Sequence, residues 1–293
     1  MKVLITGSSS YLGKNLIDLF EKKKIDYVGV DVCKPLNKNC KKIDILNPKI
    51  HLKLKHKIDT IIHLAAISNK QECDADPLRC HDVNIKGTIN LLDFALKKKI
   101  KKFIFASSEW VYENSRNKIS SFNNEIDSNN FTNYYSRLKF FTEQIIKINN
   151  INSIILRFGI IYGKCTKKNC SVVESLIDKI IKQKKLIIDS RNISRKYIYI
   201  DDITHSIYLS LKYKQKKNNN IFDIQGPKQV NLGEIIKIIT KKIKKNIIIK
   251  ERNNRLKNIR KIDSSKSNKL LRFSPKFSIK EGISNIIDNY NEN

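Results

Sequence analysis

The chain has 293 residues, of which 40% are hydrophobic, and it carries a formal net charge of +30. That length accommodates one large domain with a sizeable core, or a large domain beside a smaller one. Glycine and proline are scarce, at 9 and 5 residues, which excludes a long flexible linker or a low-complexity tail.

The positive charge comes from lysine runs that are spread along the chain, such as those in 97–102 and 241–245. A basic chain can bind nucleic acid or an anionic membrane. These runs lie beside apolar helical patterns, and few aromatic residues interleave with them, so we expect solvated surface lysines. The sequence therefore predicts no nucleic-acid partner and no membrane partner.

Cysteine usage and hydropathy predict the compartment. The six cysteines are Cys33, Cys40, Cys73, Cys80, Cys165 and Cys170. None of them forms a CxxC pair, which argues against a zinc site, and no other metal site is expected. The chain opens on a strand pattern, and no apolar run reaches the roughly 18 residues of a membrane helix. We expect a cytoplasmic protein with reduced cysteines.

Short apolar runs alternate with longer amphipathic ones along most of the chain. The predicted strands are Val3–Thr6, Tyr27–Val30, Thr60–Leu64, Lys102–Ser107, Ser153–Arg157 and Ile221–Gln225. The predicted helices are Leu12–Lys23, Asp82–Lys98, Tyr134–Ile148, Val172–Lys182, Asp202–Lys212 and Leu232–Lys244. This order indicates an α/β fold, in which a doubly wound parallel sheet is covered by helices on both faces.

The regular alternation is interrupted twice, which predicts a second, smaller part of the fold. We assign 1–163 and 195–225 to the domain that contains the main sheet. We assign 164–194 and 226–293 to a smaller C-terminal α/β lobe, expected near the carboxyl ends of the main strands, where open α/β sheets bind ligands.

A glycine turn follows the first predicted strand. Gly7 allows a tight turn, the small Ser10 lets the backbone approach a pyrophosphate, and Gly13 lets the next helix pack closely. Asp31 ends the second strand, where an acid can accept from both ribose hydroxyls and repel a 2′-phosphate. Together these features predict a dinucleotide site that prefers NAD to NADP.

Tyr135 and Lys139 lie four residues apart on a predicted helix, so their side chains share one face. A nearby ammonium group would lower the pKa of a tyrosine, ordinarily near 10, and would make its phenolate a usable base. The predicted strand that starts at Lys102 ends in Ser107 and Ser108, where a hydroxyl could donate to a substrate oxygen. The spacing of Tyr135 and Lys139 alone is weak evidence for a catalytic pair in so lysine-rich a chain. The evidence is stronger because the pair follows the glycine turn, Asp31 and Ser108 in the expected order.

Together these pieces resemble the extended short-chain dehydrogenase/reductases, and specifically the NAD-dependent sugar epimerase/dehydratase family that includes UDP-glucose 4-epimerase. The resemblance runs nearly end to end. Further matching segments are Asp44–Ile45, His63–Ala66, Asn84–Leu92, Ser107–Tyr112, Leu156–Phe158, Tyr162–Gly163, Arg195–Asp202, Lys269–Pro275 and Glu281–Gly282.

The resemblance implies a Rossmann domain that holds NAD and a smaller lobe that binds a nucleotide-diphosphate sugar. It implies catalytic roles for Tyr135, Lys139 and Ser108. The implied cofactor-binding residues are Gly7, Ser10, Tyr11, Leu12, Gly13, Asp31, Asp44, Ile45, Leu64, Ala65, Ala66, Asn84 and Lys139. The implied substrate-binding residues are Ser108, Glu109, Tyr135, Arg195 and Arg255. A homodimer is expected by analogy with the family.

Four residues depart from the family's pattern. Ser10 replaces a glycine, which is tolerable if its φ is negative. Ile160 stands where many epimerases have an asparagine that contacts the substrate. Glu109 and Trp110 replace the aspartate and glutamate of the 4,6-dehydratases, and tryptophan cannot do their acid/base work.

Three functions therefore remain. The first is a nucleotide-sugar epimerase similar to UDP-glucose 4-epimerase. The second is an NAD(P)-dependent reductase or dehydrogenase of a 4-keto nucleotide sugar or another alcohol. The third is an inactive family member that binds nucleic acid through its charge, against which the joint presence of Tyr135, Lys139, Ser108 and Asp31 argues.

Overall fold

The computed structural model describes residues 1–54, 57–113, 119–121, 126, 131–149, 151–164, 171–214, 220–255 and 258–289. The chain divides into two compact units. The first unit takes 1–116, 122–157 and 207–222, and the second takes 117–121, 158–206 and 223–293. Cys165 and Cys170 lie outside the described residues.

This division differs from the expected one at four segments. Residues 117–121, 158–163, 195–206 and 223–225 were expected with the main sheet, whereas they lie in the second unit. The two longest of these segments belong together because β7 (Ile160–Tyr162) pairs with β10 (Tyr197–Tyr199) in a separate two-stranded sheet. The roles that we assigned to the two domains stay predictions.

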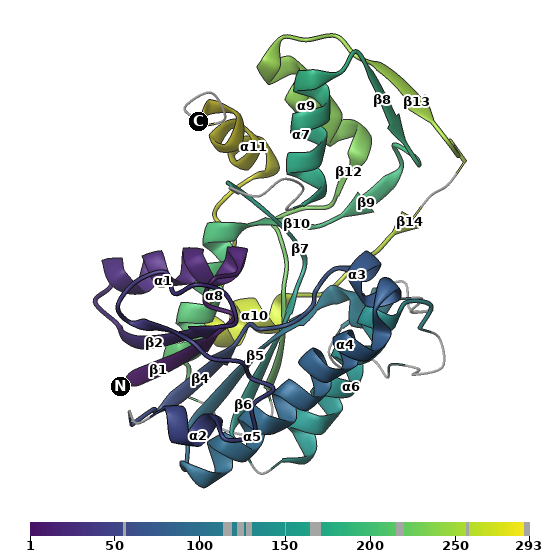
Figure 1. Ribbon diagram of the computed structural model, residues 1–293. Coiled ribbons are helices and arrows are strands. Elements are labelled where there is room, and N and C mark those ends of the chain that lie inside the picture. The colour runs from purple at the N-terminus through teal and green to yellow at the C-terminus, as the bar shows by residue number, and fades with distance from the viewer. Residues whose placement is uncertain are drawn as a thin grey trace. The chain divides into compact units, whose positions relative to one another are not determined.

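The first unit begins with alternating strands and helices (Figure 1). Its elements are β1 (Lys2–Thr6), α1 (Tyr11–Lys22), β2 (Asp26–Asp31), β3 (Cys40–Lys42), α2 (Ile50–Lys53), β4 (Thr60–His63), α3 (Lys70–Ala75), α4 (Pro77–His81), the π-helical turn η1 (Asp82–Lys86), α5 (Gly87–Lys97), β5 (Lys102–Ser108), the 3₁₀ turn η2 (Glu109–Tyr112), α6 (Tyr134–Ile148) and β6 (Ser153–Phe158). It also includes α8 (Ile200–Lys212) from Ile207 onward and β11 (Asn220–Ile224) as far as Phe222.

A seven-stranded sheet in the order β11-β6-β5-β4-β1-β2-β3 forms the centre of the first unit. The strands run parallel, as in β1 with β2 and β4 with β5. Figure 1 shows α1 on one face of the sheet and α5 and α6 on the other. The strand order reverses between β1 and β4, so the carboxyl ends of these strands form the crevice where doubly wound sheets bind ligands. The predicted fold class is confirmed.

Apolar burial explains why these strands form. The inner strands are buried along nearly their whole length, because helices cover both faces. On one face, Leu91 and Phe94 of α5 and Ile146 of α6 pack in a common core with Leu4 and Phe103 of the sheet. All twelve predicted elements are present within one or two residues of their expected ends, except that 82–98 divides into the π-helical turn η1 and α5.

The second unit contains the remaining elements of the described chain. They are β7, α7 (Val172–Lys182), β8 (Lys185–Ile188), β9 (Ile193–Arg195), β10, β12 (Val230–Asn231), α9 (Leu232–Ile243), β13 (Ile248–Glu251), β14 (Asn258–Ile259), α10 (Ser265–Leu271) and α11 (Ile279–Asp288). Its short strands form a three-stranded sheet, β12-β9-β14, and the pairs β10-β7 and β13-β8. The mixed short strands and helices match the expected α/β lobe.

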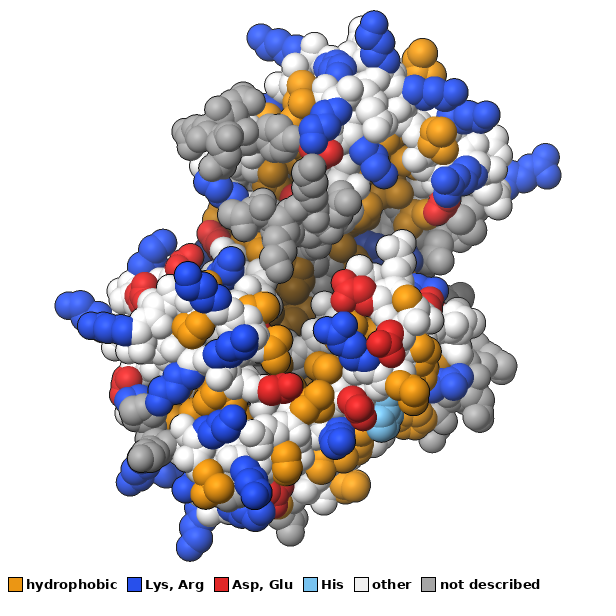
Figure 2. Space-filling view, viewed as in Figure 1, with side chains coloured by type: hydrophobic (Ala, Val, Ile, Leu, Met, Phe, Trp, Pro, Cys, Tyr) orange, Lys and Arg blue, Asp and Glu red, His pale blue; other side chains and the backbone are white. Residues whose placement is uncertain are grey.

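The face of the molecule drawn in Figure 2 is basic but not sharply patterned. Figure 2 shows lysine and arginine side chains scattered over the visible face, with acidic side chains between them. No helix in the described parts of the chain is long and apolar enough to cross a membrane. Those parts also contain no group of three or more His, Cys, Asp or Glu side chains that could hold a metal ion.

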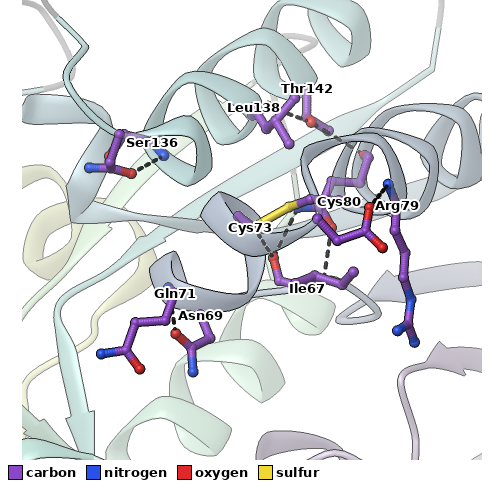
Figure 3. The surroundings of a disulfide bond; sticks show 12 residues. Ile67, Asn69, Gln71, Cys73, Arg79, Cys80, Ser136, Leu138 and Thr142 are labelled. Atoms are coloured by element: carbon purple, nitrogen blue, oxygen red, sulfur yellow. Dashed lines mark hydrogen bonds between the residues drawn. A yellow bond between two sulfur atoms is a disulfide. The ribbon is translucent and has the colours of Figure 1, made fainter.

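The expectation that the cysteines are reduced is wrong for one pair. Cys73 in α3 and Cys80 in α4 form a disulfide, with their Cα atoms 5.2 Å apart (Figure 3). Nothing in the local sequence indicates this pair, because the cysteines are seven residues apart and meet only when α3 turns back into α4. The disulfide packs in an apolar cluster with Tyr135 and Leu138 of α6. It removes the cysteine argument for a reducing compartment, so the cytoplasmic location stays a prediction.

Candidate active site

The glycine turn between β1 and α1 forms the base of the site. Gly7 has a φ of +72°, in the left-handed region that favours glycine. A Cβ atom at Gly7 would also lie 2.7 Å from the backbone nitrogen of Ala65, which follows β4. A Cβ atom at Gly13 would collide with the carbonyl oxygen of Gly7. Both glycines are therefore required by close backbone approach.

Ser10 fits the turn in place of a glycine, as expected, because its φ is −67°. It is the N-cap of α1, and its hydroxyl accepts a hydrogen bond from the backbone nitrogen of Gly13 at 3.0 Å. Tyr11 and Leu12 then form the first two residues of the helix and are half-buried. The turn thus presents a capped helix N-terminus, the kind of backbone that binds phosphates.

Asp31 lies at the end of β2, next to this turn. Its Oδ2 accepts from the backbone nitrogen of Ser9 at 2.9 Å, and its Oδ1 accepts from that of Cys33 at 3.0 Å. The carboxylate is half-buried, and each of its oxygens has a further lone pair. The glycine turn and this acid fit the diphosphate and a ribose of a dinucleotide.

The segment after β4 lines the other side of the turn. Leu64, Ala65 and Ala66 are half-buried, and the backbone nitrogen of Ala65 donates to the Thr6 hydroxyl at 3.3 Å. Asn84 of η1 holds the next residue, because its Oδ1 accepts from the backbone nitrogen of Ile67 at 2.8 Å and its Nδ2 donates to the Ile67 carbonyl at 2.9 Å. The Asn84 amide thus fixes the loop.

The predicted adenine contact divides into one exposed and one buried residue. Asp44 is exposed, and its Oδ1 accepts from the backbone nitrogen of Leu46 at 2.9 Å. The side chain of Ile45 is buried in the core, where it packs closely on Gly87. Only Asp44 presents its side chain to solvent.

Tyr135 and Ser108 meet at the carboxyl edge of the sheet. Tyr135 is in the first turn of α6, where Asn133 caps the helix by accepting from the backbone nitrogen of Ser136 at 2.8 Å. Ser108 is the last residue of β5, and its hydroxyl forms a hydrogen bond with Tyr135. Burial raises the pKa of Tyr135 to about 12, and the bond to Ser108 opposes that rise.

Lys139 lies one turn further along α6, as its spacing predicted. Its Nζ donates to the carbonyl oxygen of Ala106 in β5 at 2.8 Å, and it lies 4.7 Å from the centre of the Phe105 ring. Burial lowers the pKa of Lys139 to about 8, and the carboxylate of Glu143 opposes that change. The Nζ atom of Lys139 also lies 6.0 Å from the centre of the Tyr135 ring, near enough for its charge to influence the phenol.

The predicted substrate-binding residues fall in both units. Glu109 follows Ser108 as the first residue of η2 and is buried. Arg195 ends β9 in the second unit, is buried, and donates from Nη1 to the Ser194 carbonyl at 2.7 Å. Arg255, also in the second unit, is exposed. The geometry brings Ser108, Tyr135 and Lys139 together and leaves the role of the arginines as a prediction.

Two charged residues behind the site were missed from the sequence. Glu143 of α6 is fully buried and pairs with Arg157 of β6, which is also buried. The signals were present, because Glu143 lies four residues after Lys139 and Arg157 interrupts an apolar strand. The pairing of Glu143 with Arg157 cannot be identified before the fold is known.

The comparisons with known proteins identify the family. A family model described as the NAD dependent epimerase/dehydratase family matches residues 3–231. The chain belongs to this family. The resemblance read from the motifs is confirmed, and NAD is the cofactor by which this enzyme family is named.

Members of the epimerase/dehydratase family resemble the chain over its whole length. A protein of Methanocaldococcus jannaschii named "Putative UDP-glucose 4-epimerase" is 27% identical over 98% of this chain and 97% of its own. The fold matches UDP-glucuronic acid 4-epimerase from Bacillus cereus, in complex with UDP-glucuronic acid and NAD, with a TM-score of 0.86 and 24% identity, covering 100% of this chain and 99% of that one. It also matches UDP-glucose 4-epimerase from Thermotoga maritima, with UDP-glucose, with a TM-score of 0.85 and 21% identity over the same shares.

Proposed function

We propose that this protein is an NAD-dependent nucleotide-sugar epimerase, similar to UDP-glucose 4-epimerase, that transiently oxidises a sugar hydroxyl. The observation that carries the proposal is the hydrogen bond between Tyr135 and Ser108, with Lys139 one helical turn away, at the sheet edge that holds the glycine turn. The names of its relatives support an epimerase.

The chain's own residues divide the acid/base work. Ser108 orients the sugar hydroxyl and shares its proton with Tyr135, which takes that proton as the base. Lys139 stabilises the phenolate by its charge and binds the nicotinamide ribose. Bound NAD supplies the hydride acceptor and a positive charge near the phenol.

The pKa of Tyr135 explains why the lysine is needed. With a pKa raised to about 12 by burial, Tyr135 would be almost wholly protonated at neutral pH. An ammonium group within reach favours the phenolate and lowers that pKa toward the working range. A neutral lysine would do neither, so the charge of Lys139 is central to the proposal.

We infer that the substrate is a nucleotide-diphosphate sugar. The relatives named above are described with UDP-glucose or UDP-glucuronic acid. Arg195 and Arg255 are the residues that we propose for its phosphates, since a guanidinium matches phosphate oxygens. Glu109, beside the catalytic serine, would contact the sugar.

A reductase or dehydrogenase of a 4-keto nucleotide sugar is the second candidate. Ile160 and Glu109-Trp110 leave it open, because isoleucine lacks the amide that contacts the substrate in many epimerases and tryptophan cannot do the acid/base work of a dehydratase. Mass spectrometry of the small molecules bound to the purified protein, followed by a panel of nucleotide sugars, tests both. An epimerase interconverts two sugars with no net change in absorbance at the NADH band, whereas a dehydrogenase accumulates NADH.

We further propose that two copies associate through α6. An apolar groove beside α6 is lined by residues of α4, η1 and α6, namely His81, Ile85, Leu138, Phe141, Gln144, Ile145 and Ile148. Phe141 is 41% exposed and Ile148 82% exposed, which is unfavourable for an isolated chain. A second copy is the proposed occupant by family analogy, and Phe141→Asp should yield a monomer in analytical ultracentrifugation. A wild-type protein that sediments as a monomer would refute the dimer.

We propose that the charge serves no nucleic-acid partner. On the face drawn in Figure 2, the scatter of basic side chains, interspersed with acidic ones, supports solvation rather than a binding stripe. Submicromolar binding to nucleic acid that survives about 200 mM salt would contradict this, because nonspecific phosphate binding falls steeply with salt.

A further inference from the structure

Glu143 is a buried carboxylate directly behind the catalytic pair. It lies four residues after Lys139 and eight after Tyr135, so the three side chains follow one face of α6. Its side chain is fully buried. Burying a carboxylate is costly unless its charge is paired and its oxygens are hydrogen-bonded.

The carboxylate is held by both neighbouring strands. Its Oε1 accepts from the Ser107 hydroxyl at 2.6 Å and from Arg157 Nε at 2.9 Å, and its Oε2 accepts from Arg157 Nη2 at 2.6 Å. Arg157 also donates from Nη1 to the Tyr112 hydroxyl at 2.6 Å. The bidentate pair therefore ties α6 to the ends of β5 and β6 and to η2.

These bonds fix how α6 faces β5. Tyr135 meets Ser108, Lys139 meets the Ala106 carbonyl, and Glu143 meets Ser107. Three consecutive residues of the strand thus contact three successive turns of one helix face. Loss of the Glu143 contact would loosen the strand end that carries Ser108.

The same carboxylate also supplies countercharge to the lysine. Burial lowers the pKa of Lys139, and Glu143 opposes that change. His63 on β4 adds no charge, because burial lowers its pKa to about 3. The other charged groups near Glu143 are Arg157 on β6 and Lys147 on α6. Burial lowers the pKa of Lys147.

We propose that Glu143, clamped by Arg157, is a positioning residue that keeps Lys139 charged and holds Ser108 against Tyr135, with no contact of its own to substrate or cofactor. The proposal rests on the tyrosine chemistry proposed above. A purely structural ion pair is the competing interpretation, and it would affect stability without affecting the lysine.

The first test measures Lys139 directly, without activity. Lysine labelled with ¹³C at Cε is titrated by NMR, and the Lys139 signal is assigned by its loss in Lys139→Met. In Glu143→Gln, we expect the Lys139 midpoint to fall by about one pH unit. Glu143→Asp keeps the charge and should restore the midpoint. An unmoved midpoint in a folded Glu143→Gln protein overturns the proposal.

The second test separates positioning from stability. Glu143→Gln should lower kcat about tenfold with little change in KM, and should move the alkaline limb of the kcat–pH profile to lower pH. The control is Phe20→Ala, a fully buried residue of α1, which should lower the thermal midpoint without moving the pH profile. A Glu143→Gln variant that matches this control overturns the proposal.

The two proposals fail differently. If Tyr135→Phe retains turnover while Glu143→Gln still shifts the Lys139 midpoint, the tyrosine mechanism fails and the coupling of Glu143 to Lys139 stands. If Tyr135→Phe is inactive and the Lys139 midpoint does not move in Glu143→Gln, the tyrosine mechanism stands and the coupling of Glu143 to Lys139 fails.

Discussion

The Oδ2 atom of Asp31 accepts a hydrogen bond from the backbone nitrogen of Ser9 at 2.9 Å, which ties the acid that ends β2 to the glycine turn that follows β1. The residue that would select the cofactor is therefore positioned by the loop that would bind the diphosphate of the same molecule. A ligand that binds the glycine turn should therefore also contact Asp31.

Replacing Asp31 with alanine should weaken the preference for NAD over NADP. The variant loses an acceptor for ribose hydroxyls and the charge that repels a 2′-phosphate, a loss of about 1.5–3 kcal/mol for a charged hydrogen bond. Binding constants for both cofactors, measured by calorimetry, test this. Asp18→Ala, an exposed acid on α1, is the matched control. An unchanged ratio in Asp31→Ala would show that Asp31 is a bystander.

Replacing Tyr135 with phenylalanine should abolish turnover while NAD stays bound. The ring keeps its packing in the apolar cluster around the disulfide, whereas the hydroxyl that accepts the proton is lost. Product formation and the amount of copurified NAD are the two measurements. Tyr134→Phe, in the adjacent position of the same helix, should remain active. Near-normal turnover in Tyr135→Phe would refute its role as the base.

His63 should make the protein less stable as the pH falls. Its ring nitrogens face the hydroxyls of Thr6 and Thr88 at 2.7 and 3.0 Å, and burial lowers its pKa from 6.5 to about 3. The unfolded chain therefore binds this proton below about pH 6.5, whereas the folded chain binds it only near pH 3. Protonation favours unfolding in that window, by about 1.4 kcal/mol per pH unit.

Urea unfolding between pH 6 and pH 4 tests the His63 prediction. His63→Gln should flatten the fall in the free energy of unfolding, although it should lower stability at neutral pH through its altered hydrogen bonds. His81→Gln, at an exposed histidine, should leave the slope as it is in the wild type. Equal slopes in all three proteins would contradict the prediction.

Removing the disulfide should destabilise the first unit. The bond between Cys73 and Cys80 closes a short loop, for which the chain-entropy model gives about 2.5 kcal/mol. Cys73→Ala with Cys80→Ala should lower the thermal midpoint, and dithiothreitol should lower that of the wild type similarly. Cys33→Ser, at an exposed free cysteine, is the control. A wild type that does not respond to reductant and shows two further free thiols would contradict the bond.

Local sequence patterns are enough to predict the main sheet and the principal motifs. Uninterrupted apolar runs such as Val3–Thr6 form buried parallel strands because helices cover both faces. The glycine turn and the four-residue spacing of Tyr135 and Lys139 follow from local backbone geometry, so they could be read without a fold.

Which distant residues meet depends on how the strands and helices pack in the folded chain. Parallel pairing brings the ends of β5 and β6 to one edge, and this places Arg157 against Glu143 and Ser108 against Tyr135. The turn between α3 and α4 joins Cys73 to Cys80, against the expectation of reduced cysteines. The carboxylate of Asp202 in α8 accepts from the backbone nitrogen of Lys276 at 2.9 Å. Such pairs depend on chain segments far apart in sequence or on a specific turn, and residue type and local periodicity carry no information about them.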